Sequence, residues 1–152
     1  MNFQNSIKTC IKKKYANFSG RASRSEYWWF FLFYSLVGFA SQLLDVFILG
    51  QSFWLNYGLI NTIVNLILII PILSVGARRL HDTNRSGWWQ LIILIGIAIT
   101  YYNKKFLTIG FHPSSLLVLV IYILLIFWLS SLGSNKKNRF GNPIKLKKKR
   151  KS

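Results

Sequence analysis

Long apolar segments separated by short polar stretches dominate the pattern of this chain. Residues 27–49 form the first segment, about 23 residues or roughly 34 Å as a helix, enough to cross a hydrocarbon core of about 30 Å. Residues 57–77 form a second segment, in which Pro71 should kink the helix because it lacks a backbone N–H. The first helix should begin at Ser23, which has the capping-box spacing to Glu26.

The second half of the chain contains two further apolar segments. Residues 88–102 span about 15 positions, or roughly 22 Å, which is short for a complete crossing. The segment either extends through Lys104 and Lys105, whose long side chains can reach the interface, and crosses the membrane, or it is a re-entrant segment that does not cross. Residues 116–132 form the last segment, after an expected turn at 110–115 that contains a lone loop histidine, His112. The pattern predicts an all-α integral membrane protein with four transmembrane helices arranged as two hairpins.

Composition and charge support this class. The 152 residues are 52% hydrophobic and 16% aromatic, more than a soluble domain of this size can bury. The net charge of +17 suggests nucleic acid, but the basic residues flank apolar segments, so we expect no nucleic-acid partner. Eighteen of the 20 Lys and Arg residues lie in residues 1–25, in a loop at 78–85, or in residues 134–152. The positive-inside rule therefore predicts cytoplasmic termini around a membrane domain at 26–133, with an uncharged outer loop at 50–56.

The two basic ends have different expected structures. In the arm at 1–25, Ile7, Ile11, Tyr15 and Phe18 recur at helical spacing. The arm is therefore either an amphipathic helix on the inner leaflet or a solvated tail. Cys10 is the only cysteine, which excludes an intrachain disulfide. From Lys136 onward the chain should be a disordered polybasic tail suited to anionic lipid headgroups.

A polar cluster is expected inside the first two spans. Its members are Gln42, Asp45, Asn61 and Asn65. If the spans are antiparallel, Asn61 lies at the depth of Asp45, which should face protein or water because a charge facing lipid is costly. The cluster is either a proton or cation site of a transporter or channel component, or a polar clasp between helices, which we favour.

Three cytoplasmic segments, at 20–29, 77–89 and 138–143, should converge at the inner headgroup layer. They form a predicted collar for lipid or partner binding, whose candidate residues are Arg21, Arg24, Glu26, Trp28, Arg78, Arg79, His81, Asp82, Arg85, Trp88 and Trp89. Five arginines against two acids leave positive charge for an anionic lipid phosphate. Alternatively, pairs such as Arg24–Glu26 and Arg78–Asp82 pin the helices at the interface, and the other arginines only set the topology.

Catalysis has weak support in the sequence. His81 and Asp82 resemble a general base with its orienting carboxylate, but neighbours on a helix point in different directions. The sequence has no nucleophile motif, Gly-rich phosphate loop or Cys/His ligand cluster. We therefore expect no enzyme, no cofactor and no metal, and an enzyme acting on a lipid headgroup ranks third. The leading hypothesis is binding of anionic lipids or partner membrane proteins, with a possible homo-oligomer, and a transporter component is the alternative.

The motifs G-R-A-S-R-S-E-Y-W-W at 20–29 and A-R-R-L-H-D-T-N-R-S-G-W-W at 77–89 carry a family resemblance. Together with N-R-F-G-N-P at 138–143, the chain resembles the YhaH/YhaI-like bacterial inner-membrane family, a domain of unknown function. The resemblance covers residues 15–143 and implies a small multi-pass protein of the bacterial cytoplasmic membrane. Asn84 stands where a glycine is expected, and asparagine tolerates the same left-handed backbone conformation.

Overall fold

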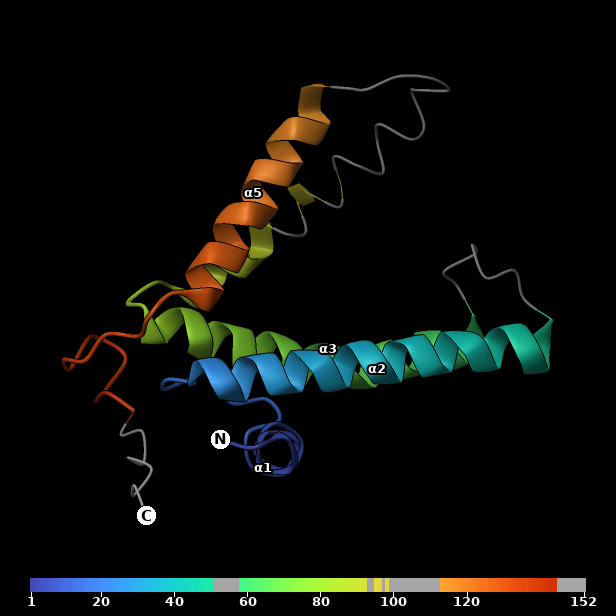
Figure 1. The fold of residues 1–152 in the computed structure, drawn as a ribbon, viewed down its shortest axis with the longest axis horizontal. Helices are drawn as coiled ribbons and strands as arrows, with labels where there is room; N and C mark the ends of the chain where they lie inside the picture. Colours follow the sequence, from blue (N-terminus) through green and yellow to red (C-terminus); the bar gives the residue numbers. More distant parts are fainter. Residues whose placement is uncertain (51–57, 93–94, 97, 99–112, 145–152) are drawn as a thin grey trace, which may run out of the picture. The chain divides into compact units, whose positions relative to one another are not determined.

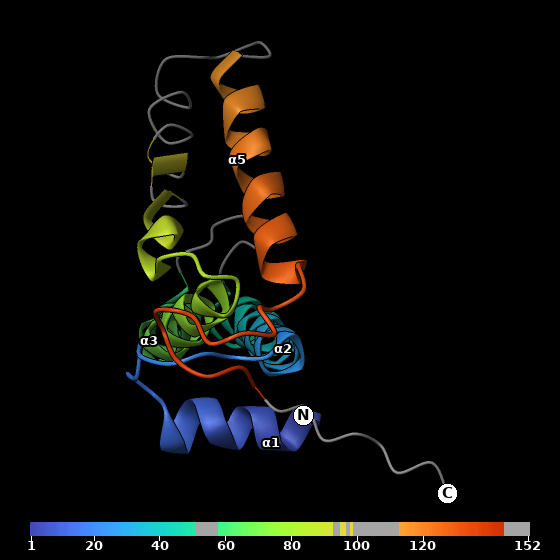
Figure 2. The same cartoon turned by 90° about the vertical axis from the view of Figure 1, so that its left-hand side faces the viewer.

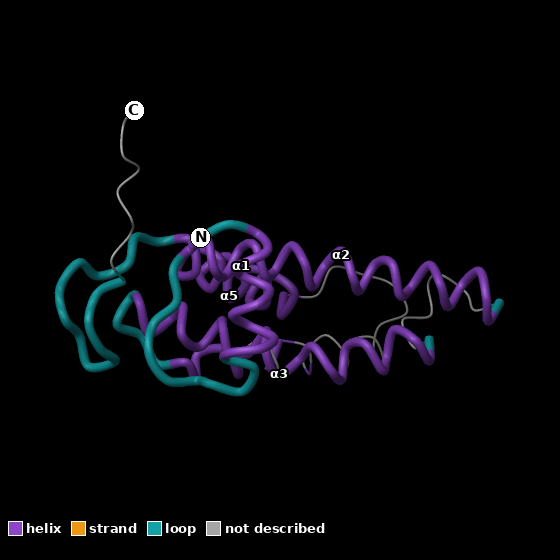
Figure 3. Tube along the Cα trace, turned by 90° about the horizontal axis from the view of Figure 1, so that it is seen from below, coloured by secondary structure: helices purple, strands orange, loops and turns teal. Residues whose placement is uncertain are grey.

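The computed structural model describes residues 1–50, 58–92, 95–96, 98 and 113–144. Within these residues the regular elements are all helices, and the only β-type pairing is one isolated bridge between Asn138 and Gly141 (Figure 3). The elements are α1 (Phe3–Lys8), the π-helix η1 (Thr9–Lys13), α2 (Arg24–Leu49), α3 (Leu59–Asp82), the 3₁₀-helix η2 (Gly87–Gln90) and α5 (Pro113–Ser130). The chain divides into two compact units, Met1–Phe18 with Ser25–Val75 and Ser19–Arg24 with Gly76–Ser152. The predicted all-α class is confirmed for the part of the chain that is described.

In the first unit, α2 and α3 lie side by side as an antiparallel hairpin (Figure 1). Both helices are long and apolar enough to cross a membrane, and only 17% and 28% of their apolar windows are buried. A core helix of a soluble protein would bury most of this surface, so the apolar side chains require another apolar environment. Helix α2 begins directly after Ser23, at the position that the capping-box pattern predicts.

The N-terminal arm is helical from Phe3 to Lys13, through α1 and η1. It runs crosswise to α2 and α3 (Figure 2). Ser6 and Cys10 are fully buried, so this part of the arm is packed and the alternative of a solvated tail does not hold for it. The predicted helix is therefore confirmed for residues 3–13, and its place on the inner leaflet stays a prediction.

Helix α3 continues to Asp82, so the prediction of a loop from residue 78 onward was wrong for residues 78–82. The helix ends where Asn84 adopts a left-handed conformation with φ of 60°. The Arg85 N–H then donates to the Leu80 carbonyl at 2.9 Å, and the Asn84 N–H donates to the His81 carbonyl at 3.0 Å. This is a Schellman C-cap, which is why the helix stops there and not at Ala77.

Two further predictions need correction, at the two ends of α5. Pro113 begins α5 instead of belonging to a turn at 110–115, because proline suits the first turn of a helix, where its missing N–H costs nothing. After α5, residues 136–141 are folded rather than disordered, and the Asn138 N–H donates to the Gly141 carbonyl at 3.1 Å. The loop at 51–56, His112, residues 99–102 and the tail from 145 lie outside the described residues.

Candidate functional site

In the second unit, the end of α3 is capped by two segments that are distant in sequence. The Ala22 N–H donates to the Arg78 carbonyl at 2.9 Å, and the Asn138 side-chain amide donates to the His81 carbonyl at 2.9 Å. Because the last carbonyls of a helix have no intrahelical partner, these bonds satisfy groups that would otherwise be unpaired. The structure thus brings together parts of the three segments whose convergence the sequence predicts.

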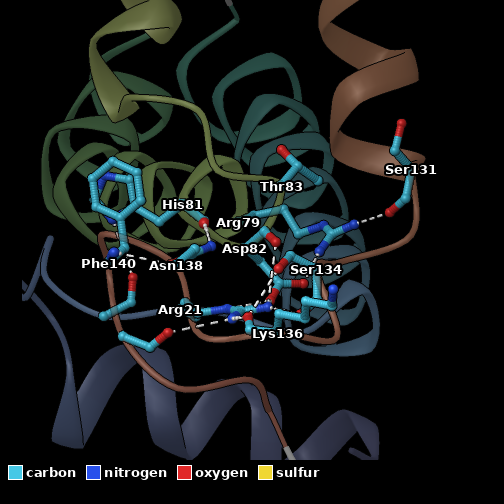
Figure 4. Close-up of polar contacts among 12 residues, drawn as sticks. Arg21, Arg79, His81, Asp82, Thr83, Ser131, Ser134, Lys136, Asn138 and Phe140 are labelled. Atoms are coloured by element: carbon cyan, nitrogen blue, oxygen red, sulfur yellow. Dashed lines mark hydrogen bonds and ion pairs between the residues drawn. The ribbon is translucent and has the colours of Figure 1, made fainter.

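The centre of this arrangement is an arginine clasp formed by Arg21, Arg79 and Asp82 (Figure 4). Arg21 Nη2 lies 2.7 Å from Asp82 Oδ1, and Arg79 Nη1 lies 2.5 Å from Asp82 Oδ2. The three side chains are 3%, 0% and 8% exposed, respectively. Buried charges are tolerated only when they are paired and hydrogen-bonded, so the two arginines and the carboxylate depend on one another.

The other guanidinium donors of the clasp bind main-chain carbonyls. Arg21 donates to the carbonyls of Lys136 at 3.1 Å and Gly141 at 3.4 Å, and also to that of Ser134. Arg79 donates to the carbonyl of Leu129 at 2.8 Å and to that of Ser131. All three nitrogens of each guanidinium therefore have protein acceptors, and the clasp fastens residues 129–141 to the end of α3. Asp82 thus pairs with Arg21 and Arg79, neither of which was named in the predicted Arg78–Asp82 pair.

Gly133 lets the chain pass close to the clasp. A Cβ at this position would lie 1.9 Å from Asp82 Oδ2, so any larger residue would displace the carboxylate. Gly87 has a similar role at the turn after α3, where a Cβ would lie 2.7 Å from the Ala77 Cβ. Gly133 was not predicted as a site residue, because a close backbone approach leaves no pattern in the sequence.

His81 points away from Asp82. Its Nδ1 lies 3.1 Å from the Gly20 carbonyl oxygen, which can only accept, so Nδ1 carries the proton. The imidazole stacks on Phe140 with ring centroids 3.8 Å apart and an interplanar angle of 3°. The Arg139 guanidinium lies 4.7 Å from the centroid of the Phe140 ring. His81 therefore holds the folded segment after α5 and is not oriented by Asp82 as a general base would be.

Two residues of the predicted collar, Arg85 and Trp89, contact α5. The Arg85 guanidinium lies 4.7 Å from the Trp128 ring centroid, and Trp89 meets the same ring edge-to-face at 5.3 Å. Trp88 is 77% exposed. An open hollow of about 290 Å³ adjoins this surface and is lined by Ser86, Trp88, Trp89, Leu91, Ile92 and Ile95. Trp128 was missed as a site residue because its place at the end of an apolar segment indicates only a membrane interface.

The remaining collar candidates differ in exposure. Arg24 is exposed at the start of α2, whereas Arg78 is fully buried. In the first unit Glu26 is buried, and Trp28 meets Tyr27 edge-to-face at 5.2 Å. The structure thus does not present the predicted collar as one exposed arginine surface.

The predicted intramembrane cluster is a separate site in the first unit. Asp45 is fully buried, and its two carboxylate oxygens accept the backbone N–H groups of Ile60 at 2.9 Å and Asn61 at 2.7 Å. Asp45 therefore caps the first turn of α3 from the neighbouring helix. Gly58 makes room for it, since a Cβ there would lie 2.0 Å from Asp45 Oδ2. The predicted proximity of Asp45 and Asn61 is confirmed.

The cluster continues along the hairpin as a chain of hydrogen bonds. Asn61 Nδ2 donates to the Gly38 carbonyl at 2.9 Å, and Asn65 Nδ2 donates to Asn61 Oδ1 at 2.6 Å. Tyr34 Oη donates to Asn65 Oδ1 at 2.7 Å, and Gln42 is buried in the same helix. Tyr34 was not predicted as a member of the cluster. It lies four residues before Gly38 and eleven before Asp45, and residues at this spacing share one face of a helix.

In the described part of the chain, no group of three or more His, Cys, Asp or Glu residues could hold a metal ion.

Comparison with known proteins identifies the family. A family model described as a protein of unknown function, DUF805, matches residues 15–142. The chain belongs to this family. It is 33% identical over 135 residues to the inner membrane protein YhaI of Escherichia coli K12, which covers 89% of this chain and 92% of that protein. It is 42% identical over 85 residues to the inner membrane protein YhaH of the same strain, which covers 56% of this chain and 69% of that protein.

No solved structure matches the chain. The family match includes Arg21, Arg79 and Asp82, so the arginine clasp lies inside the family domain. Together with the two span-length helices, the comparisons make this chain a membrane protein of the DUF805 family.

Proposed function

We propose that this protein is a four-span protein of the bacterial inner membrane whose cytoplasmic end binds anionic lipid headgroups. Helices α2 and α3 supply two spans, α5 and the segment at 88–102 supply the others, and both termini are cytoplasmic. The names of the relatives and the distribution of basic residues support this topology.

The arginine clasp is the observation that carries the proposal. It fixes residues 129–141 to the end of α3, and this segment presents Lys136, Lys137 and Arg139 as exposed side chains. Basic residues at the inner surface attract anionic lipids by about 1 kcal/mol each. Because Arg21 and Arg79 are committed to protein acceptors, the ligand surface consists of these exposed residues and not of the buried arginines.

Native mass spectrometry of the detergent-purified protein tests the proposal. The wild type should retain phosphatidylglycerol, and the variant Lys136→Gln/Lys137→Gln/Arg139→Gln should retain several-fold less. The variant Lys147→Gln/Lys148→Gln/Lys149→Gln removes the same charge from the tail and should behave more like the wild type. Equal retention by all three proteins would reject lipid binding at this surface and would direct the search to partner membrane proteins.

Transport is the second candidate and rests on the polar chain from Tyr34 to Asp45. Its weakness is that both carboxylate oxygens of Asp45 already accept backbone N–H groups. A helix cap explains this geometry without a transported ion.

A further inference from the structure

The N-terminal arm is fixed to α2 by several contacts. Asn2 caps α1 by accepting the Asn5 N–H at 3.0 Å. Ser6 Oγ donates to the Glu26 carbonyl at 2.5 Å, and the Phe3 ring meets Trp29 edge-to-face at 5.8 Å. The arm therefore packs on α2 in a defined orientation, and this orientation also fixes which of its side chains face away from α2.

The end of the arm lies at the point where Pro71 interrupts α3. A proline has no N–H, so the carbonyl four residues earlier, that of Ile67, lacks its intrahelical donor. The Tyr15 hydroxyl donates to this carbonyl. Ser74 Oγ lies 2.8 Å from the Asn17 carbonyl oxygen, to which it donates from the next turn of α3. The arm therefore supplies the donor that the proline removes, which explains why it is held at this level of the hairpin.

On α2, the arm lies at one edge of the exposed apolar surface. The arm contacts α2 at residues 26–29, and the large exposed apolar side chains of α2 lie between residues 29 and 49. Residues 31–49 of a helix span about 28 Å, close to the roughly 30 Å of a hydrocarbon core. Given the proposed membrane topology, on which this inference rests, the arm lies in the headgroup layer.

The two faces of the arm differ in charge. Ser6 and Cys10 are buried against the hairpin, whereas Lys8, Lys12 and Lys13 are exposed. We propose that Lys8, Lys12 and Lys13 form a second surface for anionic lipid headgroups, which the docked arm holds beside the α2–α3 hairpin. Its partner is the anionic bilayer itself, because three lysines on an interfacial helix match a surface of phosphate groups.

The test combines a lipid titration with a reporter of docking. Native mass spectrometry gives the apparent affinity of the full chain for added phosphatidylglycerol, and alkylation of Cys10 by a maleimide reports whether the arm is docked. The variant Lys8→Gln/Lys12→Gln/Lys13→Gln should lose at least about tenfold in affinity while Cys10 stays protected. The matched control Lys147→Gln/Lys148→Gln/Lys149→Gln removes the same charge from the tail, which was also expected to suit anionic headgroups, and it should lose clearly less because the tail is not part of the docked arm.

Three outcomes would overturn the inference. Wild-type affinity in the arm variant would show that these lysines do not bind lipid, and an equal loss in the control would show a general effect of charge. Rapid alkylation of Cys10 in the arm variant would show that the lysines hold the arm through the protein. Each outcome is separate from the proposed function, which depends on Lys136, Lys137 and Arg139 and fails only if their variant retains the same lipid.

Discussion

Asn84 shows how one backbone angle sets the end of a helix. Its φ of 60° is a conformation that glycine adopts freely, asparagine tolerates and other residues adopt at a cost of about 1–2 kcal/mol. We expect Asn84→Gly to unfold at or above the wild-type temperature in detergent, and Asn84→Ala to unfold at a lower one. Tryptophan fluorescence during heating measures both. If Asn84→Ala is as stable as the wild type, the Schellman cap does not control the end of α3.

Asp82 is the residue on which the clasp depends most. Asp82→Asn keeps the size of the side chain but leaves two buried guanidinium groups without a counter-charge. Breaking a buried ion pair in this way costs about 3–5 kcal/mol. We expect a large fall in the unfolding temperature and loss of a single peak in gel filtration. Lys137→Gln, which changes an exposed charge in the segment after α5, is the control and should have little effect. A mild effect of Asp82→Asn would mean that the main-chain acceptors alone hold Arg21 and Arg79.

Helix α3 depends on its neighbour for its N-terminal cap. Asp45→Asn retains an acceptor oxygen and should keep most of the stability, whereas Asp45→Ala should cost about 1–2 kcal/mol. Thermal unfolding separates the two variants. A cation or proton site would respond differently, because Asp45→Asn would then abolish flux in proteoliposomes while the protein stays folded. That result would favour the transport alternative over the helix cap.

The docking of the arm depends on Tyr15. Tyr15→Phe keeps the ring and removes only the hydroxyl that donates to the Ile67 carbonyl, so the arm loses one hydrogen bond to α3, at a cost of about 0.5–1.5 kcal/mol. We expect Cys10, which is fully buried in the docked arm, to be alkylated faster in this variant. Phe18→Ala changes an exposed ring near the end of the arm and serves as the control. Equal rates in the wild type and Tyr15→Phe would show that the hydroxyl does not hold the arm.

The elements could be predicted from apolar length and capping residues, but their ends depended on tertiary contacts. Apolar runs located α2 and α3, and the Ser23–Glu26 spacing located the start of α2. The partners Arg21 and Arg79 of Asp82 could not be predicted from the sequence. Arg78 and Arg79, four and three residues before Asp82, are both within reach on the same helix, and the position of Arg21 depends on how a distant segment packs. The fold of residues 134–141 was missed for a related reason. Three of its carbonyls accept hydrogen bonds from Arg21, and a carbonyl is present at every residue, so the sequence gives no sign of these contacts.

At the scale of the whole molecule, every functional proposal depends on the membrane topology, because it decides which segments face the cytoplasm. Two helices have the length and composition of spans, α5 is a shorter apolar helix, and residues 99–102 of the remaining segment lie outside the described range. The positive-inside rule predicts that the termini and residues 78–85 are inside and that Lys104 and Lys105 are on the other side. A four-span protein and a three-span protein with a re-entrant segment therefore differ in the side on which residues near 104 are found.

Single cysteines in a Cys10→Ser background decide between these topologies. A membrane-impermeant maleimide added to intact cells should label Asn56→Cys and Asn103→Cys, because both positions lie in predicted outer loops. It should not label Ser152→Cys until the inner membrane is permeabilised. Labelling of Asn103→Cys only after permeabilisation would mean that residues 88–102 return to the cytoplasmic side. Residues 116–132 would then begin inside and end outside, so the segment after α5 would lie outside. This segment is bound to the end of α3 through the clasp, and the two must therefore lie on the same side of the membrane. The clasp therefore requires an even number of crossings between Asp82 and Ser134, and it predicts that Asn103→Cys is labelled from outside.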